Sequence, residues 1–286
     1  MKIITTQSGI IEEINSIKSQ KKTVGFVPTM GALHQGHLSL IKKAVAENDV
    51  CVASIFVNPT QFNNSDDLKN YPRTLEKDCQ MIENEGCKLV FAPSSEGIYT
   101  KNETESPFEF DFQGLDKVME GIFRPNHFNG VVQIVSKLFE LVKPDKAYFG
   151  EKDFQQLAII RLMTNELAFP VEIVGCPIIR EKSGLAMSSR NELLTDNERV
   201  AAAHIYAVLK ESTLFAHETS VEELKNAVIA AINQKAELKV EYFEIIDGNN
   251  LQSIENWNET DYVIGCITVY CGKVRLIDNI KYKSKN

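Results

Sequence analysis

Two histidines that flank a glycine form the most chemically suggestive feature of the sequence. His34, Gly36 and His37 make an HxGH pattern within FVPTMGALHQGHLSL, between an expected strand and an expected helix. Imidazoles in such a turn can donate hydrogen bonds to a nucleotide phosphate, while the glycine and the helix N-terminus allow close backbone approach. A histidine that only caps or packs the turn is the alternative, and the paired spacing favours phosphate binding.

The classical nucleotide-binding patterns do not fit this turn. It contains no GxGxxG, and the stretch from Gly31 to His37 follows the P-loop spacing only up to the position where that motif requires lysine. The sequence therefore argues against a Walker-type kinase.

A second polar element, GLAMSSRN, contains Met187, Ser188, Ser189 and Arg190. Its hydroxyls and backbone amides are neutral donors for phosphate oxygens, and Arg190 supplies a permanent forked charge for a leaving pyrophosphate. Alone, the segment is equally typical of a loop or a helix cap. Together with HxGH it indicates displacement at a nucleotide phosphate.

Alternating strand-like and helical segments must position the first of these motifs. Short apolar runs suited to strands alternate with helical patterns. The expected strands are 23–28, 50–57, 88–93, 146–150 and 171–176, and the expected helices are 38–48, 74–86, 131–143 and 153–168. This order predicts an α/β domain over residues 1–184, with a doubly wound, Rossmann-like parallel sheet covered by helices on both faces. Residues 94–114 are polar and poorly periodic, and predict a long surface excursion.

Residues 185–286 follow a different order. Helical patterns at 197–212 and 220–235 precede strand-like runs at 240–247, 261–270 and 274–278. Helices followed by strands predict a second, smaller α+β domain with antiparallel strands.

Composition excludes several classes of protein. The 286 residues are 43% hydrophobic and 24% charged, as in globular proteins, and a net charge of -8 disfavours nucleic-acid binding. The N-terminus has no long apolar run and carries Glu12 and Glu13, so we expect a cytoplasmic protein that makes no membrane contact. The six cysteines form no CxxC pair, which predicts buried free thiols.

Six sequence blocks together resemble the pantothenate synthetase family, the pantoate–β-alanine ligases of the HxGH nucleotidyltransferase superfamily. They are FVPTMGALHQGH, NPTQF, YPRT, FRPNHFNGV, FGEKDFQQL and AMSSRN, between Phe26 and Asn191. The resemblance implies ATP-dependent condensation of pantoate with β-alanine through pantoyl adenylate, releasing AMP and pyrophosphate in pantothenate and coenzyme A biosynthesis. It also implies Mg2+ and a homodimer; the sequence itself identifies no metal ligand.

The same resemblance assigns the nucleotide site. His34, His37, Lys152 and Arg190 become catalytic residues, with Lys152 a ligand of the α-phosphate or pyrophosphate. Asp153 is a candidate for ribose or Mg2+ contacts, although such residues in an exposed loop are usually only solvated. The remaining residues implied to line the ATP site are Pro28, Met30, Gly31, Gly36, Gly150, Glu151, Ile179, Met187, Ser188 and Ser189.

Two glutamines match the family's pantoate ligands. The amides of Gln61 and Gln156 can donate to a carboxylate and accept from a hydroxyl. Gln155 is the alternative to Gln156; we favour Gln156, whose spacing of four from Lys152 would place both on one face of a helix that began at the lysine. The resemblance also places Met30, Phe62, Val131 and Val132 against the apolar part of pantoate, with ordinary core packing as the alternative.

Two other functions remain open at this point. A related adenylyltransferase could transfer AMP to a phosphorylated acceptor, but such an acceptor would favour lysine or arginine where the two glutamines stand. A binding module or an RNA-binding relative of the synthetases would not need a full set of catalytic motifs, and the acidity of the chain disfavours RNA.

Overall fold

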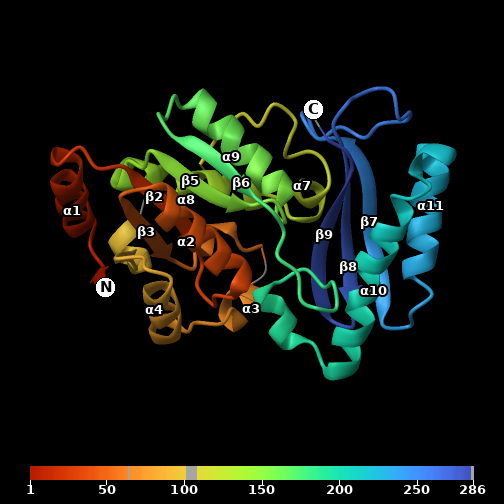
Figure 1. The fold of residues 1–286 in the computed structure, drawn as a ribbon, viewed down its shortest axis with the longest axis horizontal. Coiled ribbons are helices and arrows are strands. Elements are labelled where there is room, and N and C mark those ends of the chain that lie inside the picture. The colour runs from red at the N-terminus through yellow and green to blue at the C-terminus, as the bar shows by residue number, and fades with distance from the viewer. Residues whose placement is uncertain (64, 101–107, 285–286) are drawn as a thin grey trace. The chain divides into compact units, whose positions relative to one another are not determined.

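The computed structural model describes residues 1–63, 65–100 and 108–284 (Figure 1). The chain folds into two compact units. The first comprises Met1–Glu151 and Gln156–Pro177, and the second comprises Lys152–Gln155 and Ile178–Asn286. The predicted surface excursion begins with the short helix α5 (Ser95–Ile98), and its residues 101–107 lie outside the described part of the chain.

The first unit is built on a parallel sheet, which confirms the predicted Rossmann-like fold. Its described strands, in spatial order, are β1 (Lys2–Ile4), β4 (Leu89–Phe91), β3 (Val50–Ile55), β2 (Val24–Thr29), β5 (Lys146–Gly150) and β6 (Glu172–Cys176). The sequence did not predict the short edge strand β1 or the helix α1 (Gln7–Ser19) that follows it.

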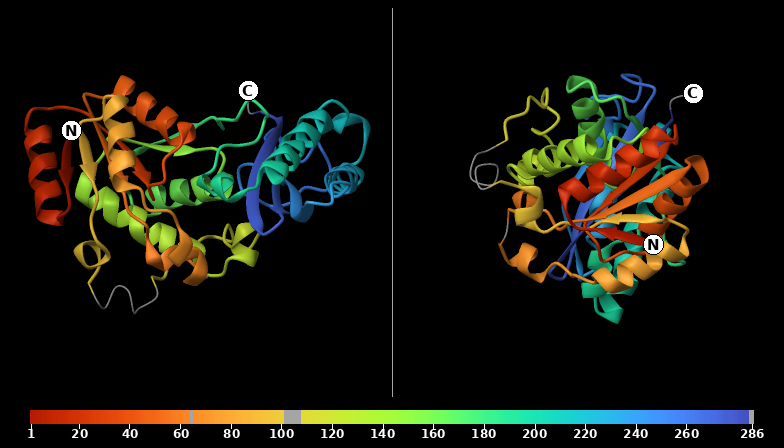
Figure 2. Two further views of the ribbon diagram at one scale, coloured as in Figure 1. Left: turned by 90° about the horizontal axis from the view of Figure 1, so that it is seen from below. Right: turned by 90° about the vertical axis from the view of Figure 1, so that its left-hand side faces the viewer.

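Helices cover both faces of this sheet (Figure 2). Successive strand residues point to opposite faces, so Phe26 packs into the core cluster formed with α1, α8 (His127–Val142) and α9 (Phe154–Glu166). Val27, next in the chain, packs instead with α2 (Gln35–Glu47) and α4 (Leu75–Asn84). Both faces of β2 are therefore buried, as its uninterrupted apolar sequence requires.

Strand β2 occupies the position where the winding of the sheet reverses. It pairs with β3 on one side and with β5 on the other, and all of these pairings are parallel. Ligands of open α/β sheets bind beside the carboxyl ends of the strands at such a point. The HxGH segment directly follows β2, and Gly150 ends β5, so the HxGH segment and the predicted nucleotide segment at Gly150 both begin at this edge.

The second unit is a smaller α+β fold, as predicted. Helices α10 (Asp196–Ser212) and α11 (Val221–Ile232) precede an antiparallel sheet of β7 (Leu238–Asp247), β8 (Val263–Cys271) and β9 (Val274–Lys283). A capping box begins each helix, and their apolar faces share one core with the sheet. The short helix η3 (Ala216–Glu218) connects α10 and α11.

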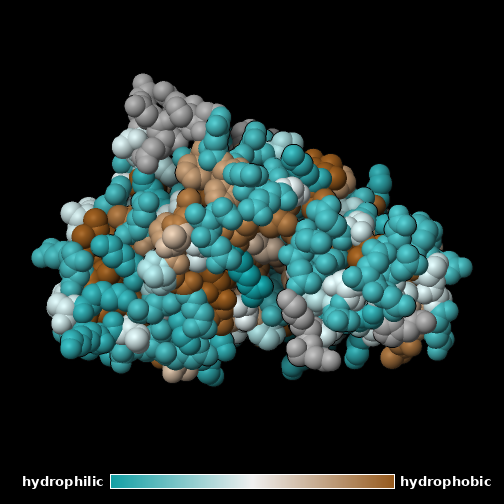
Figure 3. All heavy atoms as spheres, turned by 90° about the horizontal axis from the view of Figure 1, so that it is seen from above, coloured by the Kyte–Doolittle hydropathy of each residue, from teal (hydrophilic) through white to brown (hydrophobic). Residues whose placement is uncertain are grey.

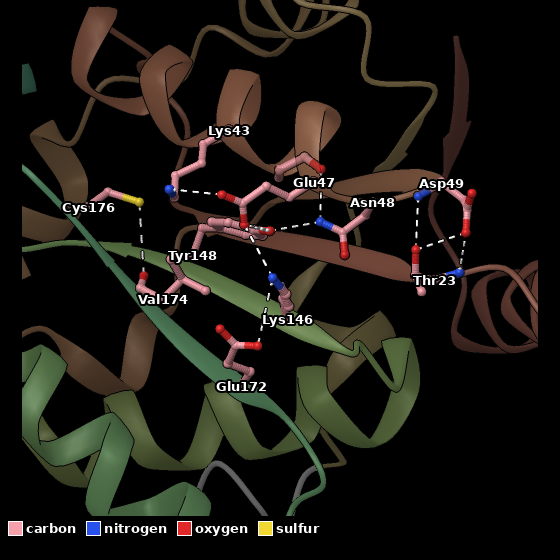
Figure 4. A network of polar contacts seen from close by, with 11 residues as sticks. Thr23, Lys43, Glu47, Asn48, Asp49, Lys146, Tyr148, Glu172, Val174 and Cys176 are labelled. Carbon is pink, nitrogen blue, oxygen red and sulfur yellow. Dashed lines mark hydrogen bonds and ion pairs between the residues drawn. The ribbon is translucent and has the colours of Figure 1, made fainter.

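Polar contacts tie α2 to the strands beside it (Figure 4). Glu47 accepts hydrogen bonds from the Tyr148 hydroxyl at 2.9 Å and from Lys43 at 2.9 Å, and Lys146 lies 3.4 Å away. These partners, Lys43 and Tyr148 first, lower the pKa of the Glu47 carboxyl. Burial raises the pKa of the Tyr148 phenol.

The cysteines and the surface agree with the composition. All six cysteines are buried free thiols, as predicted. The face drawn in Figure 3 is mainly hydrophilic, with smaller apolar areas. Among the described residues, none of the helices is both long and apolar enough to traverse a bilayer.

Candidate nucleotide and acid-substrate sites

The HxGH histidines lie at the N-terminus of α2. His34 is the N-cap of this helix in extended conformation, and its Nδ1 accepts a hydrogen bond from the Gly36 amide at 3.1 Å. The sequence placed the whole motif in the turn before the helix, but Gly36 and His37 belong to its first turn. The motif therefore combines two imidazoles with the positive end of a helix dipole.

Backbone contacts determine which nitrogen of each ring carries the proton in the neutral form. The amide of His34 donates to His37 Nδ1 at 3.4 Å, which completes a capping box with the Gly36 contact. Because both Nδ1 atoms accept, both neutral rings carry their proton on Nε2. The ring centroids lie 4.1 Å apart, so the two Nε2–H donors belong to one compact pair. Such a pair suits phosphate oxygens, which only accept.

Gln61 lies at the end of η1 (Pro59–Gln61), and its side chain is 8% exposed. Its Nε2 donates to the Met30 sulfur at 2.8 Å, and its Oε1 accepts from Asn58 at 3.3 Å. The structure thus brings together Gln61 and Met30, both predicted to contact pantoate. Asn58 was not predicted; it is 1% exposed and also donates to the Gly130 carbonyl at 2.9 Å.

The helix α8 packs against this segment. The backbone carbonyl of Gln61 accepts from His127 Nδ1 at 2.8 Å. A Cβ at Gly130 would lie 2.5 Å from the Thr60 carbonyl oxygen and 2.6 Å from the Gln61 amide nitrogen. Glycine is therefore required for α8 to approach η1 closely, which explains the glycine in FRPNHFNGV.

The apolar residues predicted around pantoate are not equally accessible. Phe62 is half-buried and packs edge-on against Tyr71 with ring centroids 5.6 Å apart. Val131 and Val132 are 3% and 0% exposed within the core cluster of the first unit. Their burial supports core packing, which was the alternative interpretation.

A cavity of about 270 Å³ opens beside Met30 and Gly31 at the carboxyl ends of β2 and β3. It is lined further by Ile55, Phe56, Arg73 and Thr74. Pro28 is half-buried near the end of β2, and Gly31 is buried with a φ of 81°. Space for a small ligand therefore exists next to two of the predicted residues.

Most of the remaining predicted nucleotide residues belong to the second unit, whereas Gly150 and Glu151 belong to the first. Lys152 and Ser188 line one cavity of about 10 Å³, which is enough for about one water molecule. Ser188 caps η2 (Ser189–Leu193) by accepting from the Arg190 amide at 3.3 Å. Met187 donates its amide to the Ile179 carbonyl at 2.9 Å, which joins the predicted adenine contact to the serine segment.

An ion pair orders the surroundings of Lys152. Arg180 binds both oxygens of Asp278 at 2.6 and 2.9 Å and stacks on Tyr206 at 3.5 Å. Asn279, next to this aspartate, donates to the Lys152 carbonyl at 3.1 Å. The backbone position of Lys152 is thereby fixed within its unit.

The predicted helical alignment of Lys152 with Gln156 is wrong. Helix α9 begins at Phe154, because residues 151–153 form a turn in which the Glu151 amide donates to the Cys176 carbonyl at 2.8 Å. Lys152 and the exposed Asp153 therefore precede the helix. Gln156 is half-buried in its first turn, whereas Gln155 is 5% exposed. The choice of Gln156 now depends only on the family motif.

The comparisons with known proteins cover the whole of this arrangement. Residues 2–281 match the model of the pantoate-beta-alanine ligase family. The chain belongs to this family. It is 57% identical over 283 residues to the pantothenate synthetase of Bacteroides fragilis strain YCH46, with 99% of both chains covered.

Solved structures of family members share this fold. The pantothenate synthetase of Thermus thermophilus is 38% identical, with a TM-score of 0.91 over 99% of this chain and 100% of that one. A pantoate-beta-alanine ligase from Francisella tularensis, complexed with beta-gamma ATP and beta-alanine, is 37% identical, with a TM-score of 0.82 over 100% and 99%. Membership in a ligase family, predicted from the motifs, is confirmed; the roles of individual residues stay predictions.

Proposed function

We propose that this pantoate–β-alanine ligase joins (R)-pantoate to β-alanine with consumption of ATP. The observation that carries the proposal is the pair of imidazoles at the N-terminus of α2, with both Nδ1 atoms occupied by backbone amides, in a chain that matches the family over residues 2–281. ATP and β-alanine are also the ligands named for the Francisella tularensis relative. Pantothenate, AMP and pyrophosphate are the products.

In the first half-reaction, a carboxylate oxygen of pantoate attacks the α-phosphorus of ATP, and the bond to pyrophosphate breaks. Charge accumulates on the phosphate oxygens, and the Nε2–H groups of His34 and His37 stabilise it together with the helix terminus. Lys152 and Arg190 neutralise the departing pyrophosphate. Gln61 and Gln156 hold pantoate through its carboxylate and hydroxyls.

In the second half-reaction, the β-alanine amine attacks the activated acyl carbon, and AMP departs. The mixed anhydride must stay bound and protected from water. The serine and arginine segment, Ser188 to Arg190, belongs to the second unit. We propose that this unit acts as a lid that brings the segment onto the phosphates during the cycle.

Magnesium and dimerisation complete the proposal. Within the described residues, no group of three or more His, Cys, Asp and Glu side chains could hold a metal ion. If Mg2+ binds together with ATP, it would supply positive charge against the phosphates, and Asp153 would be the candidate contact from this chain. We further propose that the enzyme is cytoplasmic and forms a homodimer. Light scattering of the purified chain would test the homodimer.

Omission of single substrates tests the proposed reaction. The purified chain should form pantothenate and AMP only when ATP, pantoate and β-alanine are all present. Replacement of pantoate by a phosphorylated acceptor should give no product. Stable transfer of AMP to such an acceptor, or ATP consumption that does not depend on pantoate, would contradict the proposal.

A further inference from the structure

Asp78 is a buried carboxylate to which neither the motifs nor the proposed reaction assigns a role. It lies on α4 and is 1% exposed, among the buried residues of that helix. Both of its oxygens accept hydrogen bonds, Oδ2 from the Ala32 amide at 2.9 Å and Oδ1 from the Leu33 amide at 2.8 Å. The Thr74 hydroxyl also donates to Oδ2, at 3.1 Å.

The turn that this carboxylate binds has an unfavourable backbone conformation. Gly31 and Ala32 have φ values of 81° and 49°, and a left-handed conformation is costly for alanine. The amide of Gly31 donates to the Thr29 hydroxyl at 3.2 Å, and this hydroxyl donates to the Ser54 carbonyl at 2.7 Å. Side chains thus hold three consecutive amides, and the next residue is His34. A left-handed backbone conformation in a residue other than glycine persists only where the surrounding contacts hold it in place.

We propose that Asp78 is a positioning residue for the HxGH pair, because it fixes residues 31–33 in the one conformation that starts α2 at His34. Through this turn it sets where the two Nε2–H donors meet the phosphate. This inference rests on the proposed function. Asp78 borders the cavity beside Met30 and Gly31, but a role as a metal ligand fits less well, since both of its oxygens already accept backbone amides.

The test compares two asparagine variants at opposite ends of β2. Asp78→Asn keeps one acceptor but turns the other oxygen into a donor that faces a backbone amide. Asp145→Asn is the control, because Asp145, although 44% exposed, also accepts a backbone amide of β2, that of Val24 at 2.6 Å, and pairs with Lys18 at 2.6 Å, at the amino end of the strand. Pantoate-dependent exchange between ATP and labelled pyrophosphate is measured without β-alanine, together with the melting temperature.

The two variants should differ in catalysis and not only in stability. Asp78→Asn should lower the maximal exchange rate about a hundredfold with little change in the KM for pantoate, as expected of a displaced catalytic group. Asp145→Asn should keep the exchange rate within about twofold. Wild-type exchange in a folded Asp78→Asn variant would overturn the inference, as would equal losses in both variants. Restoration of Asp78→Asn by excess Mg2+ would also overturn it, because it would identify a metal ligand.

A milder change keeps the inference testable if Asp78→Asn does not fold. Thr74→Val removes one of the three donors to the carboxylate and leaves both backbone contacts in place. It should lower the maximal exchange rate several-fold and speed deuterium uptake at residues 31–33, and no change in either would overturn the inference. Failure of the proposed function is separately visible, because the wild-type chain would then show no pantoate-dependent exchange.

Discussion

Two substitutions should separate the capping role of His34 from the catalytic role that we propose for it. Its Nδ1 caps α2 through the Gly36 amide at 3.1 Å, while Nε2 is the donor that we assign to phosphate. Asparagine is among the best N-cap residues, whereas alanine in place of a good cap costs about 1 kcal/mol. Loss of one preorganised transition-state donor costs about 3 to 4 kcal/mol, or roughly a hundredfold to a thousandfold in rate.

We therefore expect His34→Asn and His34→Ala to lose similar activity but different stability. Turnover at saturating substrates should fall about a hundredfold or more in both. The melting temperature should fall by about 3 °C for alanine, from about 1 kcal/mol of lost capping in a chain of this size, and much less for asparagine. Calorimetry and the pantothenate assay measure the two effects. Wild-type turnover of His34→Asn would refute the catalytic role and leave only the cap.

Four further predictions follow from other parts of the structure. Lys152→Ala should preserve the fold and strongly lower turnover, because the side chain is assigned to phosphate; unchanged turnover would remove it from the mechanism. Gln156→Ala should raise the KM for pantoate much more than that for ATP, and the opposite pattern would reassign the residue. Gly130→Ala should raise the KM for pantoate and lower stability by about 1 to 3 kcal/mol through overpacking against η1. The control Gly97→Ala, whose added Cβ would meet the Ser94 hydroxyl at 3.3 Å, should lower stability much less and leave this KM unchanged. Equal effects of the two substitutions would contradict this. Because the pKa of Glu47 lies below its ordinary value near 4.5, the ionised carboxylate stabilises the fold above about pH 4.5, and this contribution is lost as the pH falls. Glu47→Gln should therefore lower the melting temperature at pH 7 and progressively less below pH 4.5. A difference in melting temperature that did not shrink with acid would contradict the assignment.

Local sequence patterns predicted the parts of the fold that depend on local physics. The buried strands are apolar runs in the sequence, because strand burial leaves its pattern within a few residues. The helix after HxGH was expected to begin at Leu38 but begins at Gln35, because histidine is not among the usual N-cap residues. The edge strand β1 was missed because three residues carry too little periodicity. The start of α9 was predicted to within one residue. That Lys152 stays outside the helix was not evident, because the turn before it depends on a hydrogen bond from the Glu151 amide to Cys176 on the neighbouring strand.

The polar residues that hold the site depend on contacts between distant parts of the chain. Asp78 lies 46 residues from the turn that it binds, and Asn58 reaches a carbonyl 72 residues away. One signal was available: Asp78 is a charged residue on the same face of α4 as Ile82, where the helical pattern calls for an apolar side chain. A charge in such a position usually has a buried partner, although the sequence does not say which one.

The central claim is that pantoate is activated on the enzyme before β-alanine reacts. We place this activation on the substrate itself, because His34, His37, Lys152 and Arg190 are all assigned to phosphate and none of them to a covalent step. Isotope exchange between ATP and labelled pyrophosphate, measured without β-alanine, tests this most directly. The account predicts exchange that requires pantoate alone. Exchange in the absence of pantoate, or none until β-alanine is added, would contradict it.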